Sequence, residues 1–332
     1  MGRLETLKRF VGGCSFTALP LVCLLLVGAL GGHSQSAPAI TTRPNPPPIA
    51  VKTELVVLPV RVIDGTGDSI RGLSVNNFRV YEDGRVQRIS LFQLEDTPVT
   101  VGLVVDHSRS MGPKLAEVVA AISSFAQSSN PQDEMFIVDF NDSVSFQLPG
   151  GKPFTHDQSE LASAASAVSV GGKTALYDAV YEALKHLDLA HGDKKALIVV
   201  SDGGDNASNH KYAEVLALAR RSQAVIYAIG LIGAPNEAEQ DPRILRRLCD
   251  DTGGMAFFPE ASQTVVMVTA RIASALREQY TLGFTSNRTD ADHSFRKIQV
   301  KVNAPGHGKI RVQTRPGYSN TDPVAISGKH GS

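Results

Sequence analysis

The 332-residue chain has no tryptophan, only three cysteines and 6% aromatic residues. So few aromatic rings argue against stacking platforms for sugars or nucleic-acid bases. Lys and Arg number 33 and Asp and Glu also number 33, so the chain lacks the basic excess of a nucleic-acid-binding protein. Ordinary glycine and proline usage, with 42% hydrophobic residues, excludes the fibrous and wholly disordered classes. A chain of this length has room for about two domains.

The first 36 residues have the composition of an export signal. Arg3, Lys8 and Arg9 precede 22 uncharged residues, 11–32, which end in small side chains. A basic start, an apolar stretch and a small-residue exit are typical of a secretory signal peptide. We therefore expect residues 1–36 to send the protein to the bacterial periplasm, the cell envelope or the exterior. An uncleaved membrane anchor is the alternative, because 22 uncharged residues could span a bilayer.

Cysteine chemistry is minimal once this segment is set aside. Cys14 and Cys23 lie inside it, so the mature chain would keep Cys249 alone. A single cysteine cannot form an internal disulfide, and the fold must therefore rely on its hydrophobic core. Residues 37–52 contain five prolines, which is typical of an extended linker.

Two segments with β-type alternation flank a longer region of different character. Residues 53–96 and 279–318 each contain several short runs of period-two alternation, separated by turn-forming Gly, Asp and Pro. Neither segment has enough strands to enclose a core by itself. We expect the two to combine into one small β-sandwich, which would make the region between them an insertion. Residues 319–332 are expected to form a flexible tail.

Residues 97–278 alternate strands with helices. Continuous apolar runs near 99–105, 135–138, 196–200 and 224–229 indicate strands that are covered on both faces. Apolar residues at spacings of three and four indicate the helices between them. This alternation predicts an α/β domain with a doubly wound, mainly parallel sheet.

Oxygen-bearing side chains stand where such a sheet binds its ligands, beyond the carboxyl ends of the strands. Asp106, Ser108 and Ser110 follow the first strand of the α/β region. Thr174 precedes a helix, and Asp202 follows a later strand. Residues two apart in a turn point to the same side, so the two serines can face one ion. Carboxylate and hydroxyl oxygens are hard ligands, and we predict a divalent-cation site for Mg²⁺, with Mn²⁺ or Ca²⁺ as alternatives.

Each of these residues also has an ordinary structural explanation. Asp and Ser are common in turns and at helix starts. Thr174 could simply begin its helix, and Asp202 could open an Asp-Gly turn. Asp205 and Asn206 are expected to shape their loop, and the role of Asp178 is open.

The ordered set Asp106-x-Ser108-x-Ser110, Thr174 and Asp202 resembles the metal-ion-dependent adhesion site, or MIDAS, of von Willebrand factor A (vWA) domains. Integrin inserted domains share that pattern. The resemblance implies a Rossmann-like fold and metal-dependent binding of a protein partner without catalysis. An Asp or Glu carboxylate of the partner would then complete the coordination of the ion.

The resemblance covers residues 97–278 and extends in outline to the whole chain. The Glu-Asp-Gly of residues 82–84 and the Arg-Pro-Gly-Tyr of residues 315–318 give a layout similar to the secreted vWA-related proteins of Acidobacteria. His107 and Arg109 depart from the pattern, since the family usually has small or neutral residues between the ligands. Arg109 would lie beside the ion, where it could weaken metal binding or pair with an acidic partner.

These observations lead us to expect an exported binding protein that acts in adhesion or complex assembly and is not an enzyme. The alternative is a structural component of the envelope, in which the metal loop only stabilises the fold. No Gly-x-Ser-x-Gly elbow or His-Glu-x-x-His motif is present. A phosphate-binding loop is incomplete, because Ala167 occupies a position that requires glycine. A nucleic-acid partner is not expected.

Overall fold

The structure is a computed structural model that describes residues 55–319, apart from 95, 168, 193, 234–239, 261 and 288–294. The expected signal peptide, the proline-rich linker and residues 320–332 lie outside the described residues. In the part of the chain that is described, no helix combines the length and the apolar character needed to cross a bilayer.

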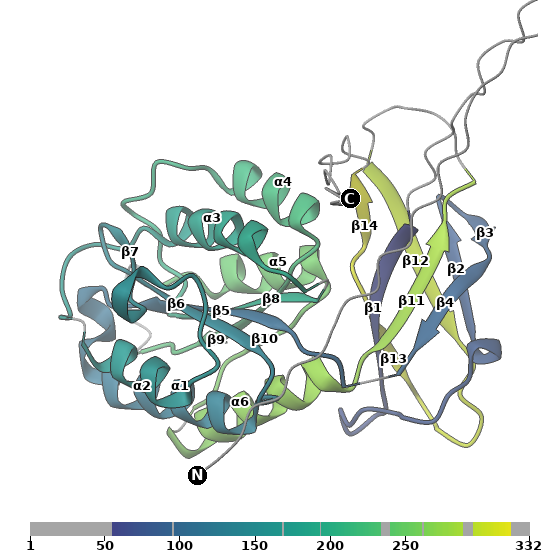
Figure 1. Ribbon diagram of the computed structural model, residues 1–332, viewed down its shortest axis with the longest axis horizontal. Helices are drawn as coiled ribbons and strands as arrows, with labels where there is room; N and C mark the ends of the chain where they lie inside the picture. Colours follow the sequence, from purple (N-terminus) through teal and green to yellow (C-terminus); the bar gives the residue numbers. More distant parts are fainter. Residues whose placement is uncertain are drawn as a thin grey trace, which may run out of the picture. The chain divides into compact units, whose positions relative to one another are not determined.

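The central sheet has six strands in the order β10-β9-β8-β5-β6-β7 (Figure 1). Five strands are parallel, and the short edge strand β7, which the sequence analysis does not predict, is antiparallel. The strands are β5 (Thr100–Asp106), β6 (Glu134–Phe140), β7 (Val144–Phe146), β8 (Lys195–Ser201), β9 (Val225–Gly230) and β10 (Ala256–Phe257). The long parallel strands are buried almost throughout, as their apolar runs predict.

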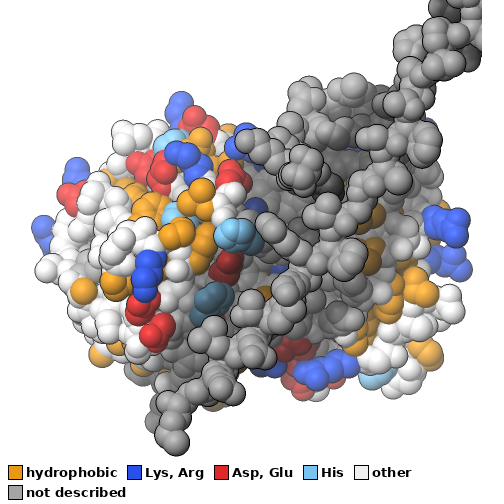
Figure 2. Space-filling view, in the orientation of Figure 1, with side chains coloured by type: hydrophobic (Ala, Val, Ile, Leu, Met, Phe, Trp, Pro, Cys, Tyr) orange, Lys and Arg blue, Asp and Glu red, His pale blue; other side chains and the backbone are white. Residues whose placement is uncertain are grey.

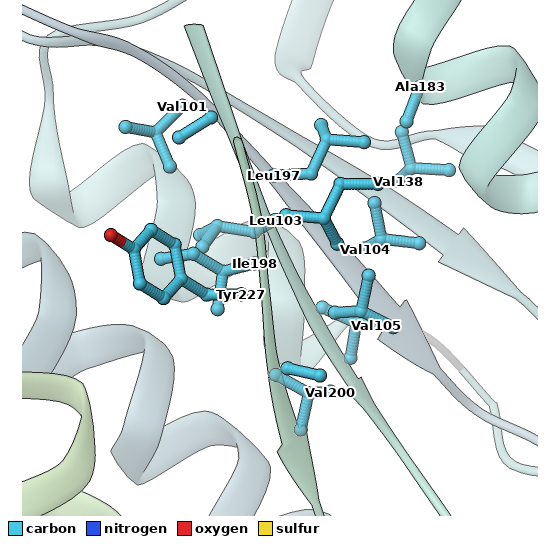
Figure 3. Close-up of a cluster of buried hydrophobic side chains, with 14 of the residues drawn as sticks. Val101, Leu103, Val104, Val105, Val138, Ala183, Leu197, Ile198, Val200 and Tyr227 are labelled. Carbon is cyan, nitrogen blue, oxygen red and sulfur yellow. The ribbon is translucent and has the colours of Figure 1, made fainter. Parts of the chain in front are cut away.

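Helices cover both faces of this sheet. One layer contains α3 (Leu176–His186), α4 (Tyr212–Ser222) and α5 (Pro242–Thr252), and the other contains α1 (Leu115–Ser128), α2 (Gln158–Ser166) and α6 (Ser262–Arg277) (Figure 1). Figure 3 shows the core between the layers. Val104 and Val138 point toward Ala183 of α3, whereas Ile198 and Tyr227 point to the opposite side of the sheet. The predicted doubly wound, mainly parallel α/β domain is confirmed.

The chain changes direction around β5. Helix α1 leads from β5 to β6 on one side, and α3 later leads to β8 on the other side of β5. The connections that leave β5 and β8 therefore diverge, and such a divergence opens a crevice at the carboxyl ends of the strands. This topology brings the ends of β5 and β8, with Asp106 and Asp202, next to each other.

The two flanking segments form two four-stranded antiparallel sheets, and each sheet takes strands from both segments. The orders are β13-β1-β11-β4 and β14-β12-β2-β3. The strands are β1 (Leu55–Ile63), β2 (Phe78–Glu82), β3 (Arg85–Gln87), β4 (Ile89–Gln93), β11 (Tyr280–Thr285), β12 (Phe295–Val302), β13 (Arg311–Gln313) and β14 (Gly317–Ser319). Leu58 and Tyr280 of one sheet share a buried cluster with Val80 and Val300 of the other. The expected sandwich is therefore present, with the α/β region inserted between its strands.

The alternating residues 86–94 are divided between two strands. Arg88 separates β3 from β4, and these belong to different sheets. The chain turns a corner of the sandwich at this point. The alternation is not kept in the structure. Val86 is 58% exposed, and Ile89 and Phe92, which are three residues apart, both pack on the sandwich core because the pairing of β4 with β11 shifts register. Strand β14, at the end of the described chain, is also additional to the expected strands.

Candidate metal centre

Asp106 is the last residue of β5 and is fully buried. Its Oδ1 accepts a hydrogen bond of 2.9 Å from the N–H of Ser108, and its Oδ2 accepts one of 2.6 Å from the hydroxyl of Ser201. Burial raises the pKa of Asp106 to about 6, the hydrogen bonds oppose that rise, and the charge of Asp202 adds to it. A positive charge placed between these two carboxylates would therefore be stabilised.

The hydroxyl oxygens of Ser108 and Ser110 lie 3.2 Å apart, so the two serines share a direction, as their spacing predicts. Ser108 precedes the 3₁₀ helix Arg109–Lys114, but its side chain makes no capping hydrogen bond to that helix. Ser108 is buried and Ser110 is half-buried. Helix capping therefore does not explain the Ser108 hydroxyl.

Thr174 lies in the loop before α3 and is buried. Its N–H donates to Oδ1 of Asn206 at 2.9 Å, and its carbonyl accepts from the N–H groups of residues 206 and 207. Helix α3 begins at Leu176 with Ala175 as its N-cap, so Thr174 does not begin the helix. Its backbone is instead locked to the loop that carries Asp202.

The Thr174 loop is also attached to the end of β5 and to the end of β6. The N–H of Gly171 donates to the carbonyl of His107 at 2.9 Å, and the N–H of Ala175 donates to the carbonyl of Asn141 at 2.7 Å. These bonds bring three loops together at one edge of the sheet. The structure thus gathers Asp106, Ser108, Ser110 and Asp202 at this edge, with Thr174 tied to them through Asn206.

Asp202 follows β8 and is 1% exposed. Its Oδ1 accepts from the N–H of Gly204 at 3.2 Å, so Asp202 does form the Asp-Gly turn, with Gly203 at a φ of 87°. Its Oδ2 is buried and has no hydrogen-bond partner within the described part of the chain. Leaving a buried carboxylate oxygen without a partner costs free energy.

These features fit a hard divalent cation. Two buried carboxylates and nearby hydroxyls offer only oxygen ligands, which suit Mg²⁺. Among the residues that the structure describes, no Lys or Arg forms an ion pair with Asp106 or Asp202, so no protein cation balances the two charges. No group of three or more His, Cys, Asp or Glu in the described ranges could hold a metal. An ion at this edge would therefore depend on the Ser and Thr hydroxyls.

Ser201 is a site residue that the sequence analysis misses. Its hydroxyl bonds Asp106 and accepts the N–H of Gly203 at 3.0 Å. The parallel register pairs Val105 with Val200, so Ser201 and Asp106 follow on the same face of the sheet. An alignment of the two predicted strands by their carboxyl ends would have revealed this neighbour.

His107 points away from the serines, as expected for the residue between them and Asp106. Its Nδ1 lies 3.1 Å from Oδ1 of Asp139, and both side chains are buried. The contact has the distance of an ion pair but not the angle of a hydrogen bond. Burial lowers the pKa of His107, but the contact with Asp139 and its charge outweigh burial, so the pKa is raised overall. Asp139, an isolated acid in the apolar strand β6, was not predicted as its partner.

The neighbouring polar residues shape loops. Asp205 accepts from the N–H of Tyr177 at 3.2 Å and from the hydroxyl of Ser208 at 2.6 Å, which fits its expected loop role. Asp178, whose role was open, accepts from both backbone N–H groups of residues 209–210. It therefore holds the segment that leads into α4.

Comparisons with known proteins agree with this architecture. Residues 100–271, just over half of the chain, match the family model of the von Willebrand factor type A domain. No curated protein sequence matches the chain. A solved von Willebrand factor type A protein from Catenulispora acidiphila is 12% identical with a TM-score of 0.47, covering 81% of this chain and 74% of that one.

Two further solved structures show a likeness over about half of this chain. The vWF domain of the type V pili tip protein Mfa5 from Porphyromonas gingivalis is 13% identical with a TM-score of 0.45, covering 55% of this chain and 95% of that one. The conserved hypothetical protein BatB from Bacteroides thetaiotaomicron is 18% identical with a TM-score of 0.44, covering 54% and 98%.

Proposed function

We propose, from the premise that this chain belongs to the von Willebrand factor type A domain family, that it binds a protein partner through a divalent cation. Asp106, Ser108, Ser110, Thr174 and Asp202 would hold the ion, with Mg²⁺ as the expected metal. The bound ion would supply the attraction for an Asp or Glu carboxylate of the partner. The chain's own residues orient the ligands and exclude water from beneath the site.

The observation that carries the proposal is the pair of buried carboxylates at neighbouring strand ends. Burial raises the pKa of Asp106, with a smaller contribution from the charge of Asp202, and Oδ2 of Asp202 lacks a hydrogen-bond partner in the described ranges. Two such groups destabilise a fold unless a counter-charge offsets them. A divalent cation would offset both charges at once, and the nearby serine hydroxyls would complete part of its coordination.

Binding is favoured over catalysis by the direction of His107. That imidazole is the nearest in sequence to the candidate ligands, but it pairs with Asp139 on the other side of the sheet. It therefore does not offer a base to a substrate at the ion. We also propose that the protein is exported, because residues 1–36 have the composition of a signal peptide. Its role would then be adhesion or assembly of a complex outside the cytoplasm.

The test combines calorimetry with capture of partners. Mg²⁺ is titrated into the full chain and into Asp202→Asn, and proteins are pulled down from the native envelope with Mg²⁺ or with chelator. We expect Mg²⁺ binding and chelator-sensitive capture by the wild type, and loss of both in Asp202→Asn. Asp188→Asn is the matched control, because Asp188 is an exposed carboxylate in the segment before β8, whereas Asp202 follows the other end of that strand.

Two results would reject the proposal in different ways. If the wild type does not bind Mg²⁺, the metal site itself is wrong. If Mg²⁺ binds and stabilises the fold but chelator leaves the captured proteins unchanged, the ion only stabilises the structure, which is the alternative function considered from the sequence.

A further inference from the structure

A cavity of about 250 Å³ lies between the outer face of one sandwich sheet and the amino-terminal ends of the central parallel strands. Leu55, Val57 and Leu91 line it on the sandwich side. Lys195 and Val225, the first residues of β8 and β9, line it on the other side. Because these strands are parallel, the cavity is at the opposite edge of the central sheet from Asp106 and Asp202.

The sandwich wall of this cavity is apolar although it faces outward. Leu55, Val57 and Pro59 alternate along β1 with side chains that point into the sandwich core, so residues 55–60 of β1 are apolar on both faces. Gly283 of β11 has no side chain to fill the surface, and Leu91 and Leu55 close over it, at 2.7 and 3.3 Å from where a Cβ would be. Leu55 still remains 45% exposed. The sandwich wall of the cavity is therefore well packed against its own sheet but only partly covered on its outer side.

The cavity also has polar lining residues, and Lys195 is the one that matters for an anion. Lys195 is half-buried, and no carboxylate in the described ranges forms an ion pair with its ammonium. Thr97 also lines the cavity, but its hydroxyl is buried and has no partner within the described residues. An ammonium at the edge of an apolar cavity attracts an anion strongly, because the local dielectric is low. Apolar walls with a few convergent polar groups at a junction of domains are typical of small-molecule sites.

We propose that this cavity binds a small aliphatic carboxylate, with the hydrocarbon chain on the Leu55, Val57 and Leu91 wall and the carboxylate at Lys195. The volume of about 250 Å³ equals that of roughly eight waters at about 30 Å³ each, which suits a chain of hexanoate to octanoate size. A ligand bound there contacts both the sandwich and the first residues of β8 and β9. It would therefore tie the two parts of the described chain together.

A chain-length series tests the apolar part of the site. Butanoate, hexanoate, octanoate and dodecanoate are titrated calorimetrically into the full chain, below their micellar concentrations. Burial of each methylene is expected to raise affinity about fourfold until the cavity is full. We expect this rise to end near octanoate. A rise that continues unchanged to dodecanoate would place the ligand on an open surface and overturn the proposal, as would the absence of binding by octanoate.

Head-group and side-chain changes test the polar part. Lys195→Gln is expected to weaken the binding of octanoate roughly tenfold and to leave the binding of octanol unchanged. Only octanoate carries the charge that the ammonium attracts. Lys309→Gln, in an exposed loop, is the matched control and should bind octanoate as the wild type does. Equal binding of octanol and octanoate by the wild type would refute a carboxylate site.

Filling the cavity gives the decisive comparison. Val57→Phe keeps a residue that favours β-strands and occupies the space of the ligand chain, so octanoate binding should be lost while Mg²⁺ binding persists. Leu91→Phe, at a half-buried position of β4, serves if Val57→Phe does not fold. Undiminished octanoate binding by the folded variant would sink the inference. Asp202→Asn should bind octanoate normally, which separates this site from the proposed metal function.

Discussion

The hydroxyl of Ser201 donates a 2.6 Å hydrogen bond to Oδ2 of Asp106 and joins the ends of two adjacent parallel strands. The same hydroxyl oxygen accepts the N–H of Gly203 at 3.0 Å. Ser201 therefore fixes both the carboxylate of Asp106 and the start of the turn that carries Asp202. This one buried hydroxyl therefore adds to the pairing of β5 with β8 in positioning the two candidate acidic ligands.

Removal of the Ser201 hydroxyl should destabilise the carboxyl ends of β5 and β8. Ser201→Ala leaves Oδ2 of Asp106 without its donor, and we expect a loss of about 1–3 kcal/mol in the free energy of unfolding, together with weaker Mg²⁺ binding. Urea unfolding and calorimetry measure the two effects. Ser143→Ala, in an exposed turn, should change stability by less than about 0.5 kcal/mol. A Ser201→Ala variant as stable as this control would contradict the assigned role.

Asp202→Asn should change the stability of the protein differently in the absence and in the presence of Mg²⁺. Without metal we expect the variant to be at least as stable as the wild type, because the repulsion of Asp106 is removed. At a Mg²⁺ concentration about 100 times the dissociation constant, the wild type should gain about 2.7 kcal/mol and the variant little. Thermal unfolding with Mg²⁺ and with chelator reports both. Equal gains by the two proteins would remove Asp202 from the ligand set.

Gly203→Ala should be strongly destabilising because two effects coincide. Its φ of 87° disfavours a side chain, and a Cβ would lie 2.4 Å from the backbone oxygen of Asp241 at the start of α5. We expect a loss of about 3 kcal/mol or more, measured by chemical unfolding. Gly150→Ala is the control, since its φ is 69° and no atom lies within 4 Å of the added Cβ. This control should lose about 1 kcal/mol, and equal losses would disprove the steric part.

Asp178 should make the free energy of unfolding depend on pH in the acidic range. Burial raises the pKa of Asp178, but hydrogen bonds from residues 209–210, including the His210 ring, outweigh burial, and the pKa is lowered overall from 3.8. A carboxylate with a lowered pKa contributes stability above its unfolded value, and this contribution disappears as pH falls through the folded value. We expect Asp178→Asn to be less stable than the wild type near pH 5 and nearly equal to it near pH 2, by urea unfolding. A difference that does not change with pH would contradict this account.

A hydrogen bond within the sandwich links its second strand, β2, to its last strand, β14. The hydroxyl of Tyr318 in β14 donates to the buried carboxylate of Glu82 in β2, which also pairs with Arg296. Tyr318→Phe leaves one acceptor of a buried charge unsatisfied, and we expect a loss of about 1–3 kcal/mol in urea unfolding. Tyr81 is half-buried in the same strand as Glu82, and Tyr81→Phe should lose less stability than Tyr318→Phe. The opposite order would show that this contact is not important for stability.

The sequence by itself determined the α/β architecture and the location of the candidate ligands. Runs such as residues 99–105 are apolar because both faces of their strands are covered, so local composition alone indicates that these strands are buried. The carboxyl ends of parallel strands lie at one edge, so Asp106 and Asp202 could be placed together before any coordinates. The spacing of Ser108 and Ser110 likewise gave their common direction. These features depend on local periodicity and on a general rule of topology.

Only the tertiary structure decided the contacts that depend on register and on the path of the chain. Ser201 meets Asp106, and His107 meets Asp139, because adjacent strands align at particular residues, and no single strand contains that information. The separation of β3 from β4 at Arg88, and the register shift that puts both Ile89 and Phe92 on the core, are likewise invisible in the alternation. Side-chain period reports which residues are buried, but the partner of each buried group is set by how distant strands and loops pack together.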